Sequence, residues 1–328
     1  MEWTSFPKVE LHLHLDCSLS YEVVRALEPG VTPEEYARSF KAPADCCSLL
    51  DYIRCAERPI SLMQTAEQLR MVTLDLFNQL KADHVVYAEI RFAPLQHLQQ
   101  GLTPEQVVQI VDEATKTGIQ KTGVQAGLIL CTLRHFTEEQ SIQTVKLVEA
   151  FRGTTVVGFD IAADEVGYPV HAHISAFNYA HQHAIPCTAH AGEACGAPSV
   201  WETMKQLRPA RIGHGVRSAE DPLLLEQLKV NGIHLEVCPT SNIKTGVFAN
   251  IQQHSAPIIY QSGVSMSLNT DGRAIADTTL AREYALMEEV FQWNLDHFKT
   301  CNLEAIKHSF ASPEIKQQIC QILEEAYR

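Results

Sequence analysis

The sequence predicts an α/β protein built as a (β/α)8 TIM barrel. Three observations support this fold class: eight short, β-rich apolar runs recur along the chain, amphipathic helical stretches separate them, and 328 residues suffice for one large barrel. Strands buried on both faces and alternating with helices form a parallel sheet, and eight repeats fit a barrel of typical size. The runs are residues 9–15, 85–94, 126–133, 156–163, 185–192, 211–215, 233–239 and 264–271.

Helix signals lie between these runs. Residues 103–118 and 137–151 each open with a threonine that suits an N-cap, followed by acidic residues in the first turn. Residues 222–232 end at a glycine, as is typical of a helix C-terminus. The alternation of strand and helix therefore continues through the chain.

The first connection is much longer than the others. About 70 residues separate the first two runs, which is too many for one crossover helix, and they contain several amphipathic stretches. We expect a helical lid insertion at about 18–82 that covers the mouth of the barrel, where the carboxyl ends of the strands meet. No linker or low-complexity segment divides the sequence, so we expect residues 1–328 to form a single domain.

Composition excludes several classes of partner. The net charge of −13 argues against nucleic acid, because a phosphate backbone would be repelled. The start of the sequence lacks the features of a secretory signal, and no apolar run is long enough to cross a membrane. The ten cysteines are scattered along a large chain and suit reduced, structural thiols, so we expect a cytoplasmic protein.

Ionisable side chains gather at the predicted carboxyl ends of the strands. His12 and His14 lie two apart on the first strand and therefore share a face that points into the barrel. A barrel interior is normally filled by Val, Ile and Leu, and buried ionisable groups are costly unless they are paired or bound to a metal. Because every exception lies on the catalytic face, we expect a metal centre. The residues at later strand ends are His190, Glu193, His214 and Asp271.

Three histidines and one aspartate supply nitrogen and oxygen ligands. This donor set suits Zn²⁺, with Fe²⁺ or Co²⁺ as possible substitutes. With a coordination position left open, a bound water would have its pKa lowered to about 7 and would supply hydroxide. Glu193 and His214 then remain to move protons beside that water. The chemistry indicated is hydrolytic attack on an electrophilic carbon.

The remaining histidines have a simpler interpretation. We expect residues 170–184 to form a surface helix whose four histidines, among them His173, are solvated. His97, His135 and His234 either line the mouth of the barrel or pack in the interior, and the sequence leaves both readings open.

Five motifs in sequence order resemble the adenosine deaminase family of the amidohydrolase superfamily. The resemblance runs from about residue 6 to about residue 310, and "SLLDYI" and "VVYAEIRFAP" also match the family's lid and second-strand patterns. Each motif is moderately specific, and all of them in this order are highly specific. The five motifs are "VELHLHLD", "HAGE", "RIGHG", "EVCPTSN" and "SLNTD".

The resemblance implies a zinc enzyme with one Zn²⁺ ion per chain. The ion would be held by His12, His14, His190 and Asp271. Glu193 would donate a proton to N1 of a purine and so make C6 electrophilic.

The same resemblance implies how the reaction proceeds. His214 would orient the metal-bound water and help to deprotonate it. Attack at C6 would give a tetrahedral intermediate that expels ammonia and leaves a hypoxanthine ring. Substrate contacts would come from His14, Asp16 and Ala163, with Asp16 on a ribose hydroxyl.

Three positions depart from the family pattern. Gly272 stands where the family commonly has a second aspartate, which hydrogen-bonds the purine N7. Ala163 stands at the glycine of the family's "LAGDE" loop, whose N–H faces N3, and alanine keeps that N–H. Cys17 replaces the glycine that usually follows Asp16. The first two changes concern recognition of the base and not the metal.

The predicted partners are a small-molecule purine nucleoside and water, and the oligomeric state stays open. We expect deamination of adenosine and 2′-deoxyadenosine to inosine nucleosides. One alternative keeps the chemistry and changes the substrate to adenine or to a modified adenosine, such as a 5′-thio or futalosine derivative. Another alternative is a catalytically inactive nucleoside-binding relative, but such a protein should lack a ligand or the catalytic glutamate, and all are present.

Overall fold

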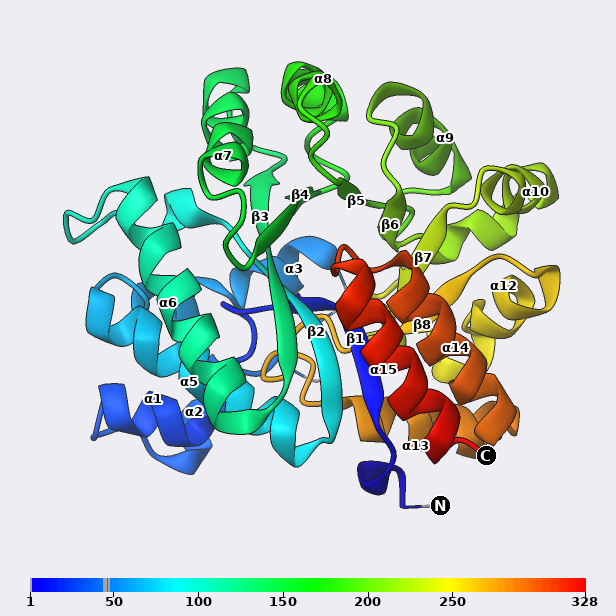
Figure 1. The fold of residues 1–328 in the computed structure, drawn as a ribbon, viewed down its shortest axis with the longest axis horizontal. Coiled ribbons are helices and arrows are strands. Elements are labelled where there is room, and N and C mark those ends of the chain that lie inside the picture. Colours follow the sequence, from blue (N-terminus) through cyan, green and yellow to red (C-terminus); the bar gives the residue numbers. More distant parts are fainter. Residues whose placement is uncertain (1, 44–45, 47) are drawn as a thin grey trace.

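The structure is a computed structural model that describes residues 2–43, 46 and 48–328 (Figure 1). Within these ranges eight parallel strands form two four-stranded sheets, ordered β1-β2-β3-β4 and β5-β6-β7-β8. Single bridges from Phe159 to Cys187 and from Leu13 to Asp271 join the two sheets at both edges, so the strands close into the predicted barrel. The strands are β1 (Lys8–His14), β2 (Val85–Phe92), β3 (Gln125–Leu133), β4 (Val156–Ala162), β5 (Thr188–Ala191), β6 (Arg211–His214), β7 (His234–Val237) and β8 (Met266–Leu268).

Helices follow the strands and surround the barrel (Figure 1). Thr103 and Thr137 cap the two helices predicted after them, and each forms a reciprocal capping box with the glutamine three residues later. The first of these helices continues past its predicted end because Gly118 stays inside it and lets the ring of Phe77 approach closely. The helices are α6 (Pro104–Thr122), α7 (Glu138–Ala150), α8 (Ile174–Gln182), α9 (Ala197–Gln206), α10 (Pro222–Val230), α11 (Pro239–Lys244), α12 (Ala256–Ser262), α13 (Leu280–Phe291), α14 (Leu295–His308) and α15 (Pro313–Ala326).

The long connection between β1 and β2 is helical, as predicted. Ser20, Thr32, Ser48 and Thr65 each accept a hydrogen bond from a backbone N–H at the start of one of its helices. The helices are α1 (Tyr21–Leu27), α2 (Pro33–Ser39), α3 (Leu49–Arg54), α4 (Glu57–Ser61) and α5 (Ala66–Ala82).

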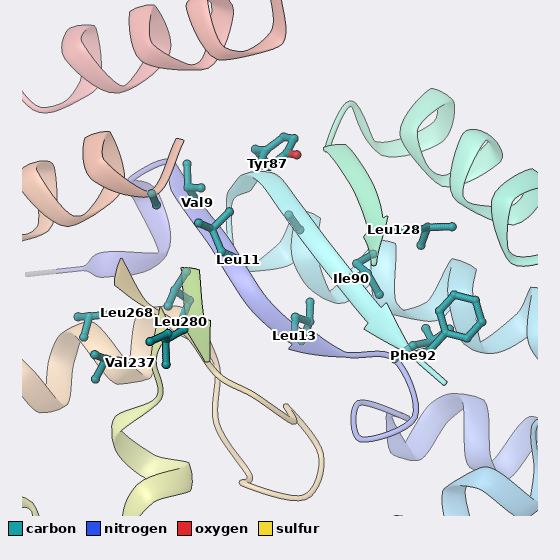
Figure 2. Packing of buried hydrophobic residues seen from close by; sticks show 14 of the residues in the cluster. Val9, Leu11, Leu13, Tyr87, Ile90, Phe92, Leu128, Val237, Leu268 and Leu280 are labelled. Carbon is teal, nitrogen blue, oxygen red and sulfur yellow. The ribbon is translucent and has the colours of Figure 1, made fainter. Parts of the chain in front are cut away.

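The two faces of strand β1 lie in different environments, and this explains why its sequence alternates between apolar and ionisable residues. Val9, Leu11 and Leu13 are buried against the apolar shell between strands and helices (Figure 2). Successive side chains of a strand point to opposite faces, so His12 and His14 face the barrel interior. The apolar face anchors the strand, and the other face supplies the ionisable groups.

The lower part of the barrel interior holds a fully buried ion network instead of an apolar layer. Arg91 contacts Asp160 at 2.8 Å and Glu236 at 2.7 Å. Arg211 contacts Glu236 at 2.7 Å and Glu89 at 2.5 Å. Buried charges of this kind persist where they are paired and hydrogen-bonded. We call this network the polar floor of the barrel. It lies beneath the histidines and consists of Glu89, Arg91, Asp160, Arg211 and Glu236.

Several strand ends leave the sheet through strained backbone. His214 and Asp271 have φ values of 59° and 64°, in the left-handed region that side chains other than glycine seldom adopt. His214 is the last residue of β6, Asp271 lies three residues after the end of β8, and both side chains line the mouth of the barrel. Such strain is typical of functional sites.

The sequence predicts no membrane-spanning segment and reduced cysteines. Among the described residues, no helix is both long and apolar enough to cross a membrane. The nine cysteines in the described ranges are all free thiols.

Candidate active site

Two histidines at the mouth are held by carboxylates of the polar floor. His12 Nδ1 lies 2.9 Å from Oε2 of Glu236, and His190 Nδ1 lies 3.1 Å from Oδ2 of Asp160. Burial alone would raise the pKa of both carboxyls, but the neighbouring cations and rings hold the pKa of each below its usual value. Each ring therefore donates its Nδ1–H to a carboxylate and presents a lone pair on Nε2.

These lone pairs converge with two other groups. His14 Nε2 lies 3.1 Å from His190 Nε2, and both His12 Nε2 and His14 Nε2 lie 3.3 Å from Oδ1 of Asp271. Burial lowers the pKa of His14 and of His190, which disfavours a proton between the rings. His12 Nε2 is buried and has no hydrogen-bond partner in the described part of the chain. Lone pairs this close repel one another, so the arrangement fits a bound cation.

The donor set suits a divalent metal ion. Imidazole nitrogen and carboxylate oxygen are ligands for zinc and its neighbours in the first transition row. Burial alone would raise the pKa of Asp271, but the rings beside it hold this pKa well below its usual value, so the carboxylate is charged. One group of ligand atoms within 4.8 Å of one another comes from His12, His190, His214 and Asp271, and an adjacent group comes from His14, Asp16 and Cys17. The structure thus brings together all the predicted ligands and also His214.

Hydrogen bonding distinguishes His214 from the other rings. Burial lowers the pKa of His254 to about 3, and its Nδ1 accepts the backbone N–H of Ala256, so its proton is on Nε2. That proton is donated to Asn242 Oδ1 at 3.3 Å, and Asn242 Nδ2 then donates to His214 Nδ1 at 3.1 Å. Burial also lowers the pKa of His214, so the neutral ring carries its proton on Nε2. His214 therefore presents a donor to the site, where His12 and His190 present lone pairs. In this tautomer it can orient a bound water by donating a hydrogen bond, but it cannot take a proton from that water as the resemblance implied.

Glu193 lies beside this donor. Its Oε2 is 3.5 Å from His214 Nε2, and its Oε1 is buried without a hydrogen-bond partner among the described residues. Burial, followed by the charge of Asp271, raises the pKa of Glu193 well above its usual value. The protonated form of the carboxyl is therefore favoured relative to an exposed glutamate.

A carboxylate that the sequence reading did not single out fixes the loop carrying Glu193. Glu165 accepts backbone N–H groups from Gly192 at 2.7 Å, from Glu193 at 3.1 Å and from Cys195 at 2.8 Å. Gly192 has a φ of 67°, and a Cβ there would lie 2.4 Å from Val200. The turn therefore depends on both a glycine and a buried acceptor.

A cavity of about 300 Å³ opens above the cluster. Its walls come from the strand ends and from α3 and α4 of the insertion, which is consistent with the predicted position of these helices. The polar lining residues are His14, Asp16, Tyr52, Glu57, Gln96, His135, His190, Glu193, His214 and Asp271, and the others are Cys17, Leu49, Ile53, Ala56, Ile60, Leu133, Ala162 and Ala163.

The three predicted substrate contacts all line this cavity. His14 and Asp16 come from the end of β1, and burial raises the pKa of Asp16 to about 6. Ala163 has a φ of 80°, a conformation that favours glycine, so the alanine keeps the backbone geometry of a glycine turn at the cost of strain.

Gly272 has no space for a side chain. A Cβ at this position would lie 2.6 Å from Cys17 Cβ, 3.1 Å from Cys17 O and 3.2 Å from the Tyr52 hydroxyl. The adjacent Arg273 turns away from the cavity and contacts Glu10 at 2.6 Å and Asp83 at 2.9 Å.

Of the histidines that the sequence left unassigned, one lines the cavity and two are buried elsewhere. His135 lines the cavity, whereas His97 and His234 are buried outside it. The prediction that His173 is solvated is wrong: its Nδ1 bonds the Ser141 hydroxyl at 2.5 Å and its Nε2 bonds the Arg134 carbonyl at 3.0 Å. The predicted surface helix starts with a 3₁₀ turn, Val170–His173, which rotates this ring into the interior.

Sequence reasoning also missed the residues that orient the site. Their signal was available, because they are ionisable or amide residues inside, or directly after, runs predicted to be buried strands. They are Asp160, Glu236 and Asn242, together with Ser241, whose hydroxyl donates to Asp271 Oδ2 at 2.7 Å.

A barrel with a His/Asp cluster and a buried glutamate at its mouth fits an amidohydrolase-type deaminase, and comparisons with known proteins support this class. A family model described as adenosine deaminase matches residues 7–326. An adenosine deaminase of Clostridium acetobutylicum is 36% identical over 327 residues, which cover 98% of each chain. The chain belongs to the adenosine deaminase family of hydrolases.

Solved structures share the fold over almost the full length. Adenine deaminase from Arthrobacter aurescens has a TM-score of 0.90 at 25% identity, covering 98% of this chain and 99% of that one. Arabidopsis ADAL complexed with IMP has a TM-score of 0.87 at 26% identity, covering 100% and 99%. The chain is thus similar to an adenosine deaminase, to an adenine deaminase and to a protein whose structure was solved with IMP.

Proposed function

We propose that this chain is a zinc-dependent deaminase that hydrolyses adenosine and 2′-deoxyadenosine to the inosine nucleosides and ammonia. The observation that carries the proposal is the convergence of three imidazole Nε2 atoms and the Asp271 carboxylate beneath the cavity, with the buried Glu193 carboxyl beside them. The matching family model and the relative from Clostridium acetobutylicum both carry the name adenosine deaminase. In this proposal the residues of the site act as metal ligands, as a proton donor and as a hydrogen-bond donor to the attacking oxygen.

In this proposal one Zn²⁺ ion is held by His12, His14, His190 and Asp271. When bound, the ion lowers the pKa of a water molecule to about 7 and so supplies a nucleophile at neutral pH. The carboxylates behind His12 and His190 keep the ring nitrogens free of protons and correctly aimed.

Glu193 and His214 handle protons and orientation. The neutral Glu193 carboxyl donates a proton to N1 of the purine, which withdraws electrons from C6 and favours attack there. His214 Nε2–H donates a hydrogen bond to the attacking oxygen and directs it at C6. The Glu193 carboxylate that remains then takes the proton of the new C6 hydroxyl and passes it to the amino group. The C6–N bond breaks as the C6=O bond forms, ammonia leaves, and Glu193 regains its proton from the next water molecule that is ionised.

The cavity favours a nucleoside over a nucleotide. Its described lining contains four acidic side chains, Asp16, Glu57, Glu193 and Asp271, and neither lysine nor arginine. A 5′-phosphate would be desolvated beside these carboxyl groups without a compensating cation.

We further propose that residues 18–82 act as the lid of a single domain and that Asp16 hydrogen-bonds a ribose hydroxyl. Asp16 is 8% exposed and lines the cavity, and Tyr52 and Ile53 of α3 also form part of its wall. Ala163 would present its backbone N–H to the purine N3.

A substrate panel tests the proposal. Metal-replete enzyme is assayed with adenosine, 2′-deoxyadenosine, adenine, AMP and 5′-methylthioadenosine, and deamination is followed by the change in purine absorbance. We expect activity on the first two and little on AMP. Activity on adenine but not adenosine would overturn the nucleoside assignment, and activity on none would overturn the function.

Metal dependence is tested on the same enzyme. Chelation should abolish activity, and reconstitution of the metal-free protein with Zn²⁺, Fe²⁺ or Co²⁺ identifies the ions that restore it. Full activity in protein shown by elemental analysis to be metal-free would contradict the proposed chemistry.

A further inference from the structure

Tyr52, in the wall of the cavity, carries a buried hydroxyl that makes no well-formed hydrogen bond with the described residues. The residue belongs to α3 and is only 4% exposed, and the polar group beside its hydroxyl is that of Ser241, whose own proton is donated to Asp271. Buried hydroxyls usually have a partner, and leaving one without a partner is costly. Because Tyr52 lines the cavity, a ligand is the missing partner that the structure suggests.

The position of this hydroxyl is defined by Gly272. It lies 3.2 Å from the point where a Cβ on Gly272 would stand, next to the Cys17 side chain. Burial raises the pKa of Tyr52 well above its usual value and raises that of Cys17 similarly, so both groups are neutral. The tyrosine therefore presents a neutral donor at a position where the sequence provides no side chain after Asp271.

The barrel order determines which edge of a purine meets this donor. Glu193 follows β5, whereas Gly272 follows β8, which is bridged to β1. In an eight-stranded barrel the fifth strand lies across the mouth from the first. A purine with N1 at Glu193 and C6 over the cluster therefore presents its imidazole edge, with the acceptor N7, to the β8–β1 side.

We propose that the Tyr52 hydroxyl donates a hydrogen bond to N7 of the purine and is a specificity-determining residue of this enzyme. The inference rests on the proposed function and adds to it a requirement for a hydrogen-bond acceptor at the N7 position. The contact comes from the lid helix, so it forms only when α3 is seated over the cavity.

The test removes each half of this hydrogen bond in turn. Tyr52→Phe keeps the ring and deletes the hydroxyl, and 7-deazaadenosine replaces N7 by C–H. For adenosine we expect Tyr52→Phe to lower kcat/KM about tenfold, mainly through KM, which is the size of one lost hydrogen bond. For 7-deazaadenosine, measured as a competitive inhibitor, we expect Tyr52→Phe to leave Ki unchanged.

Tyr36→Phe is the matched control. Its hydroxyl donates to the Leu19 carbonyl at 2.8 Å, outside the cavity, so its loss should leave both constants unchanged. The inference is overturned if Tyr52→Phe leaves kcat/KM for adenosine unchanged, or if it weakens 7-deazaadenosine as much as adenosine. Those results would leave the proposed function standing, because that function fails only if the wild-type enzyme deaminates no adenosine.

Discussion

Cys17 and Gly272 compete for a single space at the base of the cavity. The Cβ of Cys17 lies 2.6 Å from the point that a Cβ on Gly272 would occupy. The resemblance described above associates a glycine with the first position and an aspartate with the second, whereas this chain has a side chain at the first and none at the second. The two departures are therefore one structural exchange, because a side chain at either position excludes one at the other.

This exchange predicts that Gly272→Asp alone is destabilising. Overpacking a filled site costs about 1–3 kcal/mol, and the double variant Cys17→Gly with Gly272→Asp should recover most of that loss. The free energies of unfolding of the two single variants, the double variant and the wild type form a double-mutant cycle. Strict additivity in that cycle would show that the two positions do not compete.

Substitution of Glu193 should separate chemistry from metal binding. Glu193→Gln retains the shape of the side chain but cannot transfer a proton, so we expect near-normal metal content and a kcat reduced 10²–10⁴-fold, about the value of general acid catalysis. Glu57→Gln, another carboxyl change in the cavity wall, is the control and should retain turnover. Wild-type kcat in Glu193→Gln would disprove the proposed role.

The metal content of histidine variants should show which histidines bind the metal ion. His14→Ala and His190→Ala each remove a lone pair from the cluster, and we expect elemental analysis of the purified variants to show loss of the metal. His214→Ala should keep the metal and lose turnover, because this ring presents a proton to the site. Equal metal loss in His214→Ala and His190→Ala would assign His214 to the ligand set.

The barrel was predictable because its signals are local. Alternation in β1 places Leu11 and Leu13 on one face and His12 and His14 on the other, and this periodicity can be read directly from the sequence. The barrel topology then brings strand ends together regardless of their separation in the chain. This is why His190 could be placed beside His14 before any distance was known.

What could not be predicted depends on side-chain direction and on loop geometry. The sequence shows Asp160 and Glu236 inside strands, but only the structure shows that they hold His190 and His12. Tyr52 reaches the cavity because several helices of the insertion pack in one arrangement, which no periodicity specifies. His173 was misplaced for the same reason, since a short 3₁₀ turn changes the direction of a side chain.

Stability should depend on pH through a carboxyl away from the site. Burial raises the pKa of Glu283 from 4.5 to about 7, although the Thr240 N–H and the Thr278 hydroxyl donate to it. Below pH 4.5 the group is protonated in the folded and the unfolded chain, and its burial costs nothing extra. As pH rises from 4.5 to 7 the unfolded chain ionises first, so stability is lost, by about 3 kcal/mol once pH exceeds 7.

Glu283→Gln removes this titration while keeping an acceptor for the Thr240 N–H and a donor for the Thr278 hydroxyl. We therefore expect the variant to match the wild type near pH 4.5 and to become progressively more stable than it up to pH 7, in denaturant unfolding at a series of pH values. Glu289→Gln, an exposed carboxyl change on the same helix, should show no such divergence. Parallel curves for Glu283→Gln and the wild type would mean that Glu283 is ionised in the folded protein, because a carboxylate with an ordinary pKa adds no slope between pH 4.5 and 7.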